Sequence, residues 1–411
     1  MLRQLRWLRH AFWGLLALPL LFCAVEVGMR VYSTLHGPVT LVQQAIDPLL
    51  VESSATYQAL KPLQTLTLND PSLAKPVELQ TNSYGVRGPE PAVPKPFATY
   101  RILCLGDESV FGTESSYHEL WTSRLQQYLQ KRTQFHIEVI NAGVPGFCPL
   151  LSYLQYKQNL ISLQPDLVIL AFQMNDVADD YRYRRFTRLD AKGMPLACAA
   201  PGSITAERGK WSRLTRELLI AQWGKETIGS LLDRQVAHEQ EMDEAIDSQR
   251  GAYRWLESIP PQWEISIRQT LEPIGQLKEL TRATSARFLL AIAPAPWQIS
   301  AHASSGTGVR AQAGVGESEF FSSRDPFDRI QEFARLHQID TVEPSVEFLQ
   351  FDNPDRLFLQ DYPQYSRLGH ALFARELTYH IVEQIPGPWV KPNYDAEPVP
   401  ISQRPKTEIQ R

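Results

Sequence analysis

The chain has 411 residues, of which 43% are hydrophobic and 21% are charged, a composition typical of globular proteins. This composition excludes a disordered or collagen-like chain. Lysine and arginine (41 residues) nearly balance aspartate and glutamate (45 residues), so the formal net charge is −4 and nucleic acid is not expected as a partner. The four cysteines are too few for a disulfide scaffold; Cys148 and Cys198 could either pair or stay free.

Residues 1–34 have the pattern of a membrane anchor. An apolar run from Ala11 to Val25 continues, with interruptions, to Tyr32, and three arginines precede it in MLRQLRWLRH. The run extends to about 20 residues, enough to span a bilayer, and no small residues stand where a signal peptidase would cut. We therefore expect a single-pass anchor in the cell membrane, a cytoplasmic stub and an extracytoplasmic domain. A cleaved signal peptide is the alternative.

The remaining chain divides by its hydropathy pattern. Residues 35–96 have little periodicity and are interpreted as a stalk that becomes an edge segment of the domain. From residue 97 to 385, short apolar runs alternate with segments of helical spacing, which predicts an α/β domain with a doubly wound parallel sheet. In chain order, we expect a strand at 101–105, a helix at 118–129, a strand at 136–140, a helix at 150–163, strands at 166–172 and 288–293, a helix at 326–336, a strand at 339–342 and a helix at 367–385.

Two segments stand outside this alternation. Residues 180–260 are a helical insertion with amphipathic helices near 213–232 and 239–256, which could serve as a lid or as a surface for a protein partner. Residues 386–411 are polar and rich in proline, so a disordered tail is expected there.

Four short segments follow predicted strands or precede the last helix, where doubly wound sheets carry function. They are GDES at 106–109, NAGVPG at 141–146, FQMND at 172–176 and DYPQYSRLGH at 361–370. Together these segments resemble the signature blocks of SGNH (GDSL-type) hydrolases. The flanking EVGMRVY and TNSYGVRG are similar to the membrane-anchored bacterial branch of that family. The resemblance implies a flavodoxin-like sheet and a site for ester cleavage or acyl transfer.

The second and third blocks match the family where it binds the oxyanion. In the family, a glycine and an asparagine donate hydrogen bonds to the charge that develops on the ester oxygen. By resemblance these are Gly146 and Asn175, although Gln173 stands where a glycine is usual. The oxyanion donors are therefore expected to be present.

The first and last blocks depart from the family. Its nucleophile is the serine of Gly-Asp-Ser, and its proton shuttle is a histidine three residues after an aspartate. Here Glu108 takes the nucleophile position, with Ser109 one residue late, and Gln364 follows Asp361 where the histidine should be. Glutamine has no pKa near 7 and cannot move the proton. A pseudoenzyme that binds an acylated or carbohydrate ligand, or acts as a scaffold, is therefore favoured.

An active esterase or O-acyltransferase with a non-standard site is the alternative. It requires a bulged turn that turns Ser109 toward the oxyanion donors, and a base. His370 and His118 are candidate bases, but a structural role is expected for His370 and an exposed helix start for His118. No residue pattern indicates a cofactor or a transition metal, and Asp176, Asp179 and Asp180 are interpreted as a solvated loop beside arginines.

A further hypothesis concerns what Glu108 does in place of the serine. At the strand-to-helix turn, its carboxylate could reach the donors of the oxyanion hole, namely the amide of Asn175 and the backbone N–H groups at Gly146 and at the start of the helix. Hydrogen bonds to a charged group are worth about 1.5–3 kcal/mol each. We therefore expect a fixed anion there that stabilises the fold.

Overall fold

The computed structural model describes residues 46–200, 252–257, 259 and 261–390. By its internal contacts the chain divides into two units, and all the described residues belong to the larger one, Val42–Ile204 with Ala245–Arg411. The expected membrane anchor, most of the two expected insertion helices and most of the expected tail lie outside the described residues. Of the helices in the described part of the chain, none combines the length and hydropathy of a membrane span.

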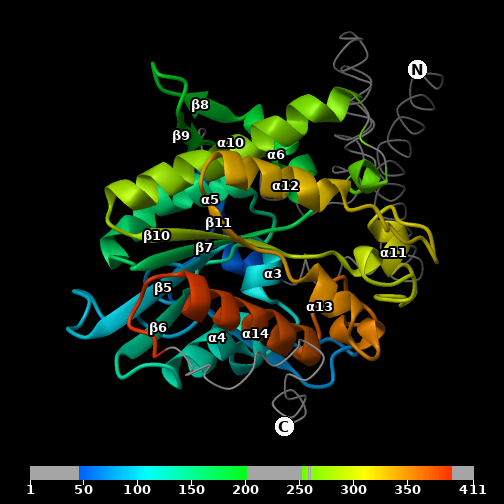
Figure 1. Ribbon diagram of the computed structural model, residues 1–411, viewed down its shortest axis with the longest axis horizontal. Coiled ribbons are helices and arrows are strands. Elements are labelled where there is room, and N and C mark those ends of the chain that lie inside the picture. Colours follow the sequence, from blue (N-terminus) through cyan, green and yellow to red (C-terminus); the bar gives the residue numbers. More distant parts are fainter. Residues whose placement is uncertain (1–45, 201–251, 258, 260, 391–411) are drawn as a thin grey trace, which may run out of the picture. The chain divides into compact units, whose positions relative to one another are not determined.

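A parallel sheet forms the centre of the larger unit (Figure 1). Its strands lie in the order β11-β10-β7-β5-β6, and every neighbouring pair is parallel. Counted along the chain, this is the 2-1-3-4-5 order of flavodoxin-like folds. The predicted doubly wound sheet is confirmed. The strands are β5 (Thr99–Leu105), β6 (His136–Asn141), β7 (Leu167–Phe172), β10 (Arg287–Ile292) and β11 (Asp340–Val342).

Helices cover both faces of the sheet (Figure 1). On one face α4 (Trp121–Gln130) packs against α14 (Arg367–Gln384). On the other face lie α5 (Pro149–Gln155), α10 (Pro261–Ala283) and α12 (Asp325–Leu336). The sequence patterns did not predict α10, which carries Pro273 in its interior, a residue that normally interrupts helices.

Shorter elements connect this framework. Two turns continue α5, a π-helical one at Tyr156–Leu160 and a 3-10 turn at Ile161–Leu163. The short helices are α3 (Glu108–Phe111), α6 (Asp176–Arg184), α11 (Val309–Gln312) and α13 (Ser345–Leu349), and β8 (Thr187–Leu189) pairs with β9 (Pro195–Cys198). Further 3-10 turns lie at Asp47–Leu49, Tyr117–Glu119, Arg254–Leu256, Pro296–Gln298 and Pro354–Leu357.

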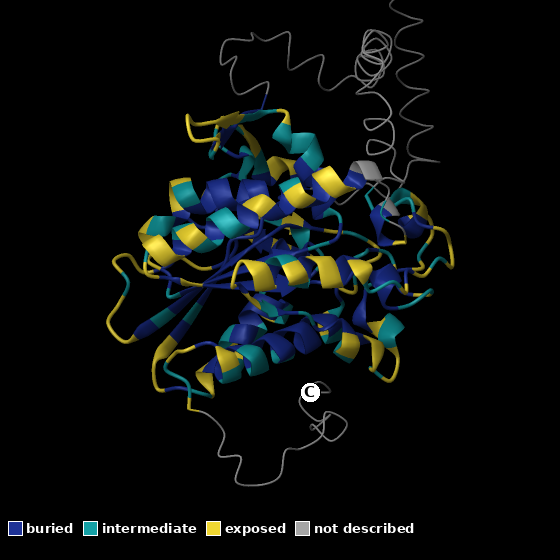
Figure 2. Ribbon diagram, turned by 45° about the horizontal axis from the view of Figure 1, so that its top comes forward, coloured by how far each residue is buried: buried dark blue, intermediate teal, exposed yellow. Residues whose placement is uncertain are grey.

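The core lies between the sheet and the inner faces of the helices. Every residue of β7, with the sequence LVILAF, is buried, because helices cover the strand on both faces. Figure 2 shows the same pattern, with dark strands and inner helix faces and exposed outer turns. The amphipathic helices α4 and α12 follow from apolar residues spaced three and four apart.

Residues 46–96 differ from the expected stalk. They form two antiparallel hairpins, β1 (Leu50–Ser53) with β2 (Tyr57–Leu60) and β3 (Thr65–Leu68) with β4 (Val77–Gln80). Leu79, Val86 and Arg87 are buried. The strands have only four residues each, too short for a clear alternation in the sequence. This part of the segment is therefore an integral part of the domain.

Candidate functional site

The turn after β5 carries the residues of the first block. Gly106 has a φ of +148°, and an added Cβ would lie 2.9 Å from the carbonyl oxygen of Ala171. Asp107 caps α3: its Oδ1 accepts the backbone N–H of Ser109 at 2.9 Å and the Ser109 hydroxyl at 2.7 Å. Ser109 is only 3% exposed. The serine hydroxyl is thus held inside the turn as part of a helix cap.

The carboxylate of Glu108 contacts the second block. Its Oε2 accepts the backbone N–H of Gly146 at 3.1 Å, so the predicted hydrogen bond is present. Gly146 has a φ of +74°, a conformation that favours glycine, and the nearest atoms to an added Cβ would be Gln58 Nε2 at 3.3 Å and the Tyr183 hydroxyl at 3.4 Å. A carboxyl oxygen of Glu108 therefore occupies a backbone donor of this block.

Asn175 does not donate to Glu108. Its Nδ2 donates to Asp179 Oδ2 at 3.0 Å, and its Oδ1 is buried without a hydrogen-bond partner. The prediction that the Asn175 amide binds Glu108 is wrong, because Asp179 lies one helical turn ahead and accepts its hydrogen bond.

The three aspartates after Asn175 lie on α6 rather than in a solvated loop, so that expectation is also wrong. Asp176, Asp179 and Asp180 are all buried. Asp179 pairs with Arg182 at 2.9 Å and Asp180 with Arg184 at 2.7 Å. The arginines one turn ahead allow two of these carboxylates to be buried on a helix.

Buried carboxyl groups gather at the carboxyl ends of β5 and β7. Burial and the charge of Glu108 raise the pKa of Asp107 well above its ordinary value, and burial and the charge of Asp107 do the same for Asp176. Burial raises the pKa of Asp179 to about 6, Arg182 opposes the rise and Glu108 adds to it. Asp107, Glu108, Asp176 and Asp179 thus lie close enough for their charges to affect one another.

Asp361 and Gln364 lie in the loop before α14. In the described part of the chain, no hydrogen bond joins either side chain to Glu108 or Ser109. Gln364 is 9% exposed, and its backbone oxygen accepts the Leu359 N–H at 2.9 Å. The loop nevertheless lies near the first block, because burial and the charge of Asp107 raise the pKa of its Tyr365.

His370 has the structural role expected of it. It is 2% exposed on α14, and its Nδ1 accepts the backbone N–H of Trp121 at 3.3 Å. Burial, with help from Arg124 and Arg87, lowers its pKa to about 3. A neutral imidazole that accepts a backbone hydrogen bond is not available as the base for Ser109. His118 is exposed as expected and lies in the 3-10 turn Tyr117–Glu119.

Arg87 is an important residue near the first block that sequence reasoning did not assign. Its guanidinium is buried and donates to the carbonyl oxygens of Phe111 and Gly112 and, at 2.7 Å, of Ser115. It therefore fixes the chain directly after α3. The available signal was the TNSYGVRG segment, which contains this arginine.

Two further residues near Glu108 come from segments without a clear sequence pattern. Gln58, on β2, donates from Nε2 to the carbonyl oxygen of Pro145 at 2.6 Å and so supports the turn that presents Gly146. Tyr253 lies near the end of the expected insertion, and burial and the charges of Glu108 and Asp179 raise its pKa. Its ring packs against Trp297 with centroids 4.6 Å apart.

The described residues contain neither a disulfide nor a cluster of metal ligands. Cys104, Cys148 and Cys198 are buried and free, so Cys148 and Cys198 do not pair. The described ranges contain no group of three or more His, Cys, Asp and Glu side chains arranged to hold a metal ion.

Comparison with known proteins gives structural neighbours only. No family model matches the sequence, and no curated protein matches it. A lipolytic protein of the G-D-S-L family from Desulfitobacterium hafniense is 13% identical, covers 68% of this chain and 98% of its own, and has a TM-score of 0.34. A lipase/acylhydrolase from Enterococcus faecalis is 12% identical, with coverages of 69% and 95% and a TM-score of 0.36.

A catalytic mutant of an acetylxylan esterase from Geobacillus stearothermophilus is 13% identical, with coverages of 69% and 94% and a TM-score of 0.35. The neighbours are GDSL-type lipolytic enzymes and esterases. Their names belong to the family that the four blocks resemble. At this identity and overlap, what the site can do follows from its own residues.

Proposed function

We propose that this chain is a membrane-anchored, extracytoplasmic SGNH-like protein that binds a ligand instead of cleaving an ester. The ligand is an acylated compound or a carbohydrate, held near the carboxyl ends of β5 and β7, or the domain serves as a scaffold. The anchor is residues 11–32, which have the length and flanking arginines of a membrane span.

The observation that carries this proposal is the hydrogen bond from the Gly146 N–H to Glu108 Oε2, at 3.1 Å. An oxyanion hole works because its donors are free to bind charge that develops only in the transition state. A resident carboxylate takes up the donor and repels a second anion at short range. Glu108 therefore opposes hydrolysis twice, by replacing the hydroxyl and by filling the hole.

The esterase alternative based on Ser109 has less support. Its hydroxyl donates to Asp107 Oδ1 at 2.7 Å, and the same oxygen accepts the Ser109 backbone N–H, which fixes the side chain in the helix cap. Gln364 cannot accept and return a proton, and His370 is already bound to a backbone N–H. Among the described residues, the group that accepts the hydrogen bond of this hydroxyl is the Asp107 carboxylate of the same helix cap, and no hydrogen bond joins the hydroxyl to a histidine.

Aromatic and carboxylate side chains near Glu108 support a polar ligand. Tyr57 packs on Tyr183 with ring centroids 4.9 Å apart, and burial and the charges of the same carboxylates raise the pKa of the nearby Tyr253. Rings offer flat apolar faces, and carboxylates accept hydrogen bonds from hydroxyl groups. Both features suit a carbohydrate.

The test uses a fluorophosphonate probe and short p-nitrophenyl esters on the purified full chain. We expect no labelling and no hydrolysis above background for the wild type and for Ser109→Ala. The double variant Glu108→Ser with Gln364→His restores the serine and histidine of the family pattern and should become labelled. Stoichiometric labelling of the wild type that disappears in Ser109→Ala would contradict the proposal and support the esterase alternative.

A further inference from the structure

The strand β11 leaves one edge of the central sheet open. It ends the strand order, and its residues Asp340–Val342 pair with Leu289–Ala291 of β10 on one side only. No described strand lies on its other side. An open edge presents backbone N–H and C=O groups that can pair with another extended chain.

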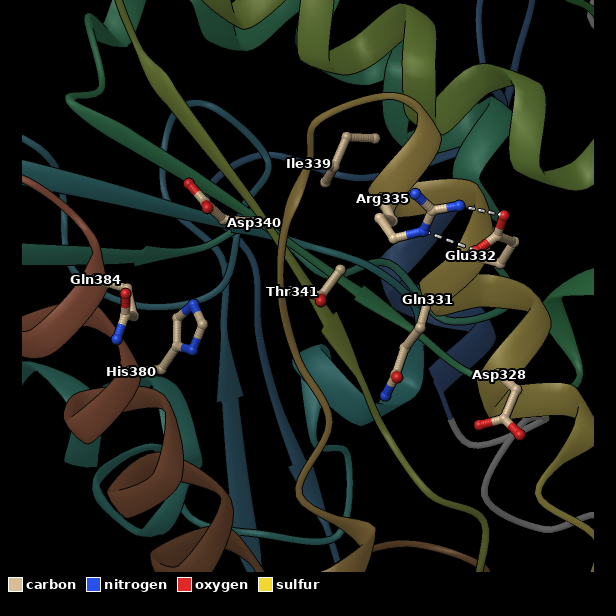
Figure 3. A pocket seen from close by; sticks show the side chains of 9 residues that line it. All are labelled: Asp328, Gln331, Glu332, Arg335, Ile339, Asp340, Thr341, His380 and Gln384. Atoms are coloured by element: carbon tan, nitrogen blue, oxygen red, sulfur yellow. Dashed lines mark hydrogen bonds and ion pairs between the residues drawn. The ribbon is translucent and has the colours of Figure 1, made fainter.

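A groove runs along this open edge between α12 and α14. It consists of two adjoining hollows of about 650 and about 330 Å³ that share Thr341, His380 and Gln384. Figure 3 shows the larger hollow, with Gln331 and Arg335 on α12, His380 and Gln384 on α14, and Thr341 of β11 between them. The groove thus gives access to the edge of β11 from outside and has a wall on each side.

The groove is strongly acidic. Among the residues that the structure describes, Arg335 is the only arginine or lysine that lines the two hollows, and it pairs with Glu332 at 2.6 Å. Both walls and the strand itself contribute carboxylates. The carboxylates in the lining are Asp328, Glu332, Asp340, Glu343, Glu347, Glu376 and Glu383.

Arginines outside the lining neutralise part of this charge. Arg324 pairs with Glu343 at 2.5 Å and Arg375 with Glu376 at 2.8 Å. Among the described residues, no arginine or lysine forms an ion pair with Asp328 or Asp340. Negative charge therefore remains on the α12 wall and on β11.

His380 adds an unused hydrogen-bonding atom. Its Nε2 is buried without a hydrogen-bond partner, and its side chain lies between α14 and β11 (Figure 3). Burial holds its pKa below the usual value although Asp340 opposes the shift. The wall of α14 thus offers a polar contact in addition to its carboxylates.

We propose that this groove binds an extended, lysine- or arginine-bearing segment of a partner protein, which pairs with β11 as an added strand. Side chains of an added strand alternate between the two sides of the sheet, so they face α12 and α14 in turn. Asp328 on the α12 wall and Asp340 on β11 form no ion pair among the described residues, so cationic side chains of the added strand find carboxylate partners there. A second copy of this groove is equally acidic and is repelled. The inference is independent of what happens at Glu108.

The first test measures peptide binding to the full chain by fluorescence anisotropy at low salt. The probe is a labelled hexapeptide that alternates lysine with valine. Its controls carry glutamate in place of lysine, or N-methyl groups on alternate backbone amides, which remove the donors for strand pairing. We expect each control to bind at least tenfold more weakly than the probe. Equal binding of the N-methylated peptide would overturn the added strand, and equal binding of the glutamate peptide would overturn the charge selection.

The second test places the site with variants. Asp328→Lys with Asp340→Lys should weaken binding of the lysine probe at least tenfold. Glu317→Lys makes half of this charge change, +2 instead of +4, at an exposed residue outside the groove and should leave the affinity within twofold. Hydrogen exchange at residues 340–342 should slow when the probe is added to the wild type. Unchanged exchange there, or equal effects of the two sets of variants, would overturn the proposal.

Two other occupants are outcomes of the same measurements. If a peptide of residues 391–411 competes more strongly than the unlabelled lysine peptide, the occupant of the groove is a segment of this chain. That result would overturn the proposal of a partner protein. Self-association of the chain that the lysine peptide reverses would identify a second copy and would overturn it as well.

Discussion

The turn at 107–109 and the loop at 361–364 are the two halves of a predicted catalytic site, and they differ in how their polar groups are satisfied. In the turn, Asp107 binds Ser109 twice and Glu108 binds the Gly146 N–H. In the loop, no described residue forms a side-chain hydrogen bond with Asp361 or Gln364. One half has acquired an internal anion, whereas the other has a neutral amide in place of a titrating group. The two halves thus depart from the expected triad pattern in two different ways.

The largest expected effect on the stability of the first half comes from Arg87, which holds the chain directly after α3. Arg87→Met removes the donors to three carbonyl oxygens and leaves them buried. Unsatisfied buried groups cost about 1–3 kcal/mol each, so we expect a loss of about 3 kcal/mol or more in the free energy of unfolding, measured in urea. Arg335→Met removes an exposed ion pair and should change it by less than about 0.5 kcal/mol. Equal losses would mean that Arg87 does not support the turn.

Glu108 and Gln364 compare the two halves directly. Glu108→Ala removes a charge-assisted hydrogen bond and should lower the free energy of unfolding by about 1.5–3 kcal/mol at pH 7. Gln364→Ala should cost less than about 1 kcal/mol, because the backbone of Gln364 and not its side chain makes the hydrogen bond. Glu108→Gln keeps an acceptor for the Gly146 N–H and should fall between them. A Glu108→Ala variant as stable as the wild type would show that the carboxylate does not stabilise the turn.

The sequence predicted the framework of this site well, for a physical reason. Buried parallel strands are continuous apolar runs, and each ends at a polar block, so the order of strands and blocks follows from hydropathy. The contact between Glu108 and Gly146 was also predictable, because the ends of neighbouring strands meet at one edge of the sheet. Local sequence is sufficient to predict a contact where one residue type at one position decides the geometry.

The predictions failed where competing partners were close. The Asn175 amide donates to Asp179, a carboxylate one helical turn ahead on the same helix, instead of to Glu108. Gln58 and Tyr253 reach the site from segments far away in the sequence, and nothing in their neighbours marks them. Contacts of this kind depend on the packing of the whole domain and not on a local pattern.

The buried carboxyl groups make the first half of the site sensitive to pH. Their pKa values lie above those of the unfolded chain, so between about pH 4 and 7 the folded state binds more protons and the free energy of unfolding falls as pH rises. For Asp179, the rise in pKa from 3.8 to about 6 corresponds to a loss of about 3 kcal/mol in the free energy of unfolding at a pH above both values.

Asp107→Asn tests this dependence. The amide keeps an oxygen that can accept from Ser109 and removes the buried charge. We expect the wild type to lose thermal stability from pH 5 to pH 8, and Asp107→Asn to lose less and to exceed the wild type by more than about 1 kcal/mol at pH 8. Parallel profiles for the two proteins would mean that Asp107 is not among the groups that titrate.

The smallest effect concerns the hydroxyl of Ser109. Ser109→Ala removes the 2.7 Å bond to Asp107 Oδ1, but that oxygen still accepts the backbone N–H at 2.9 Å, so the loss should be no more than about 1 kcal/mol in thermal unfolding at pH 7. Ser152 is the matched control, because its hydroxyl is equally buried but has no hydrogen-bond partner. Ser152→Ala should therefore be neutral or stabilising. If Ser109→Ala were also neutral, the hydroxyl would contribute nothing to the cap. Since a hydroxyl released from the cap is what the esterase alternative needs, the pair of variants measures how firmly the turn holds the one serine that could have replaced Glu108.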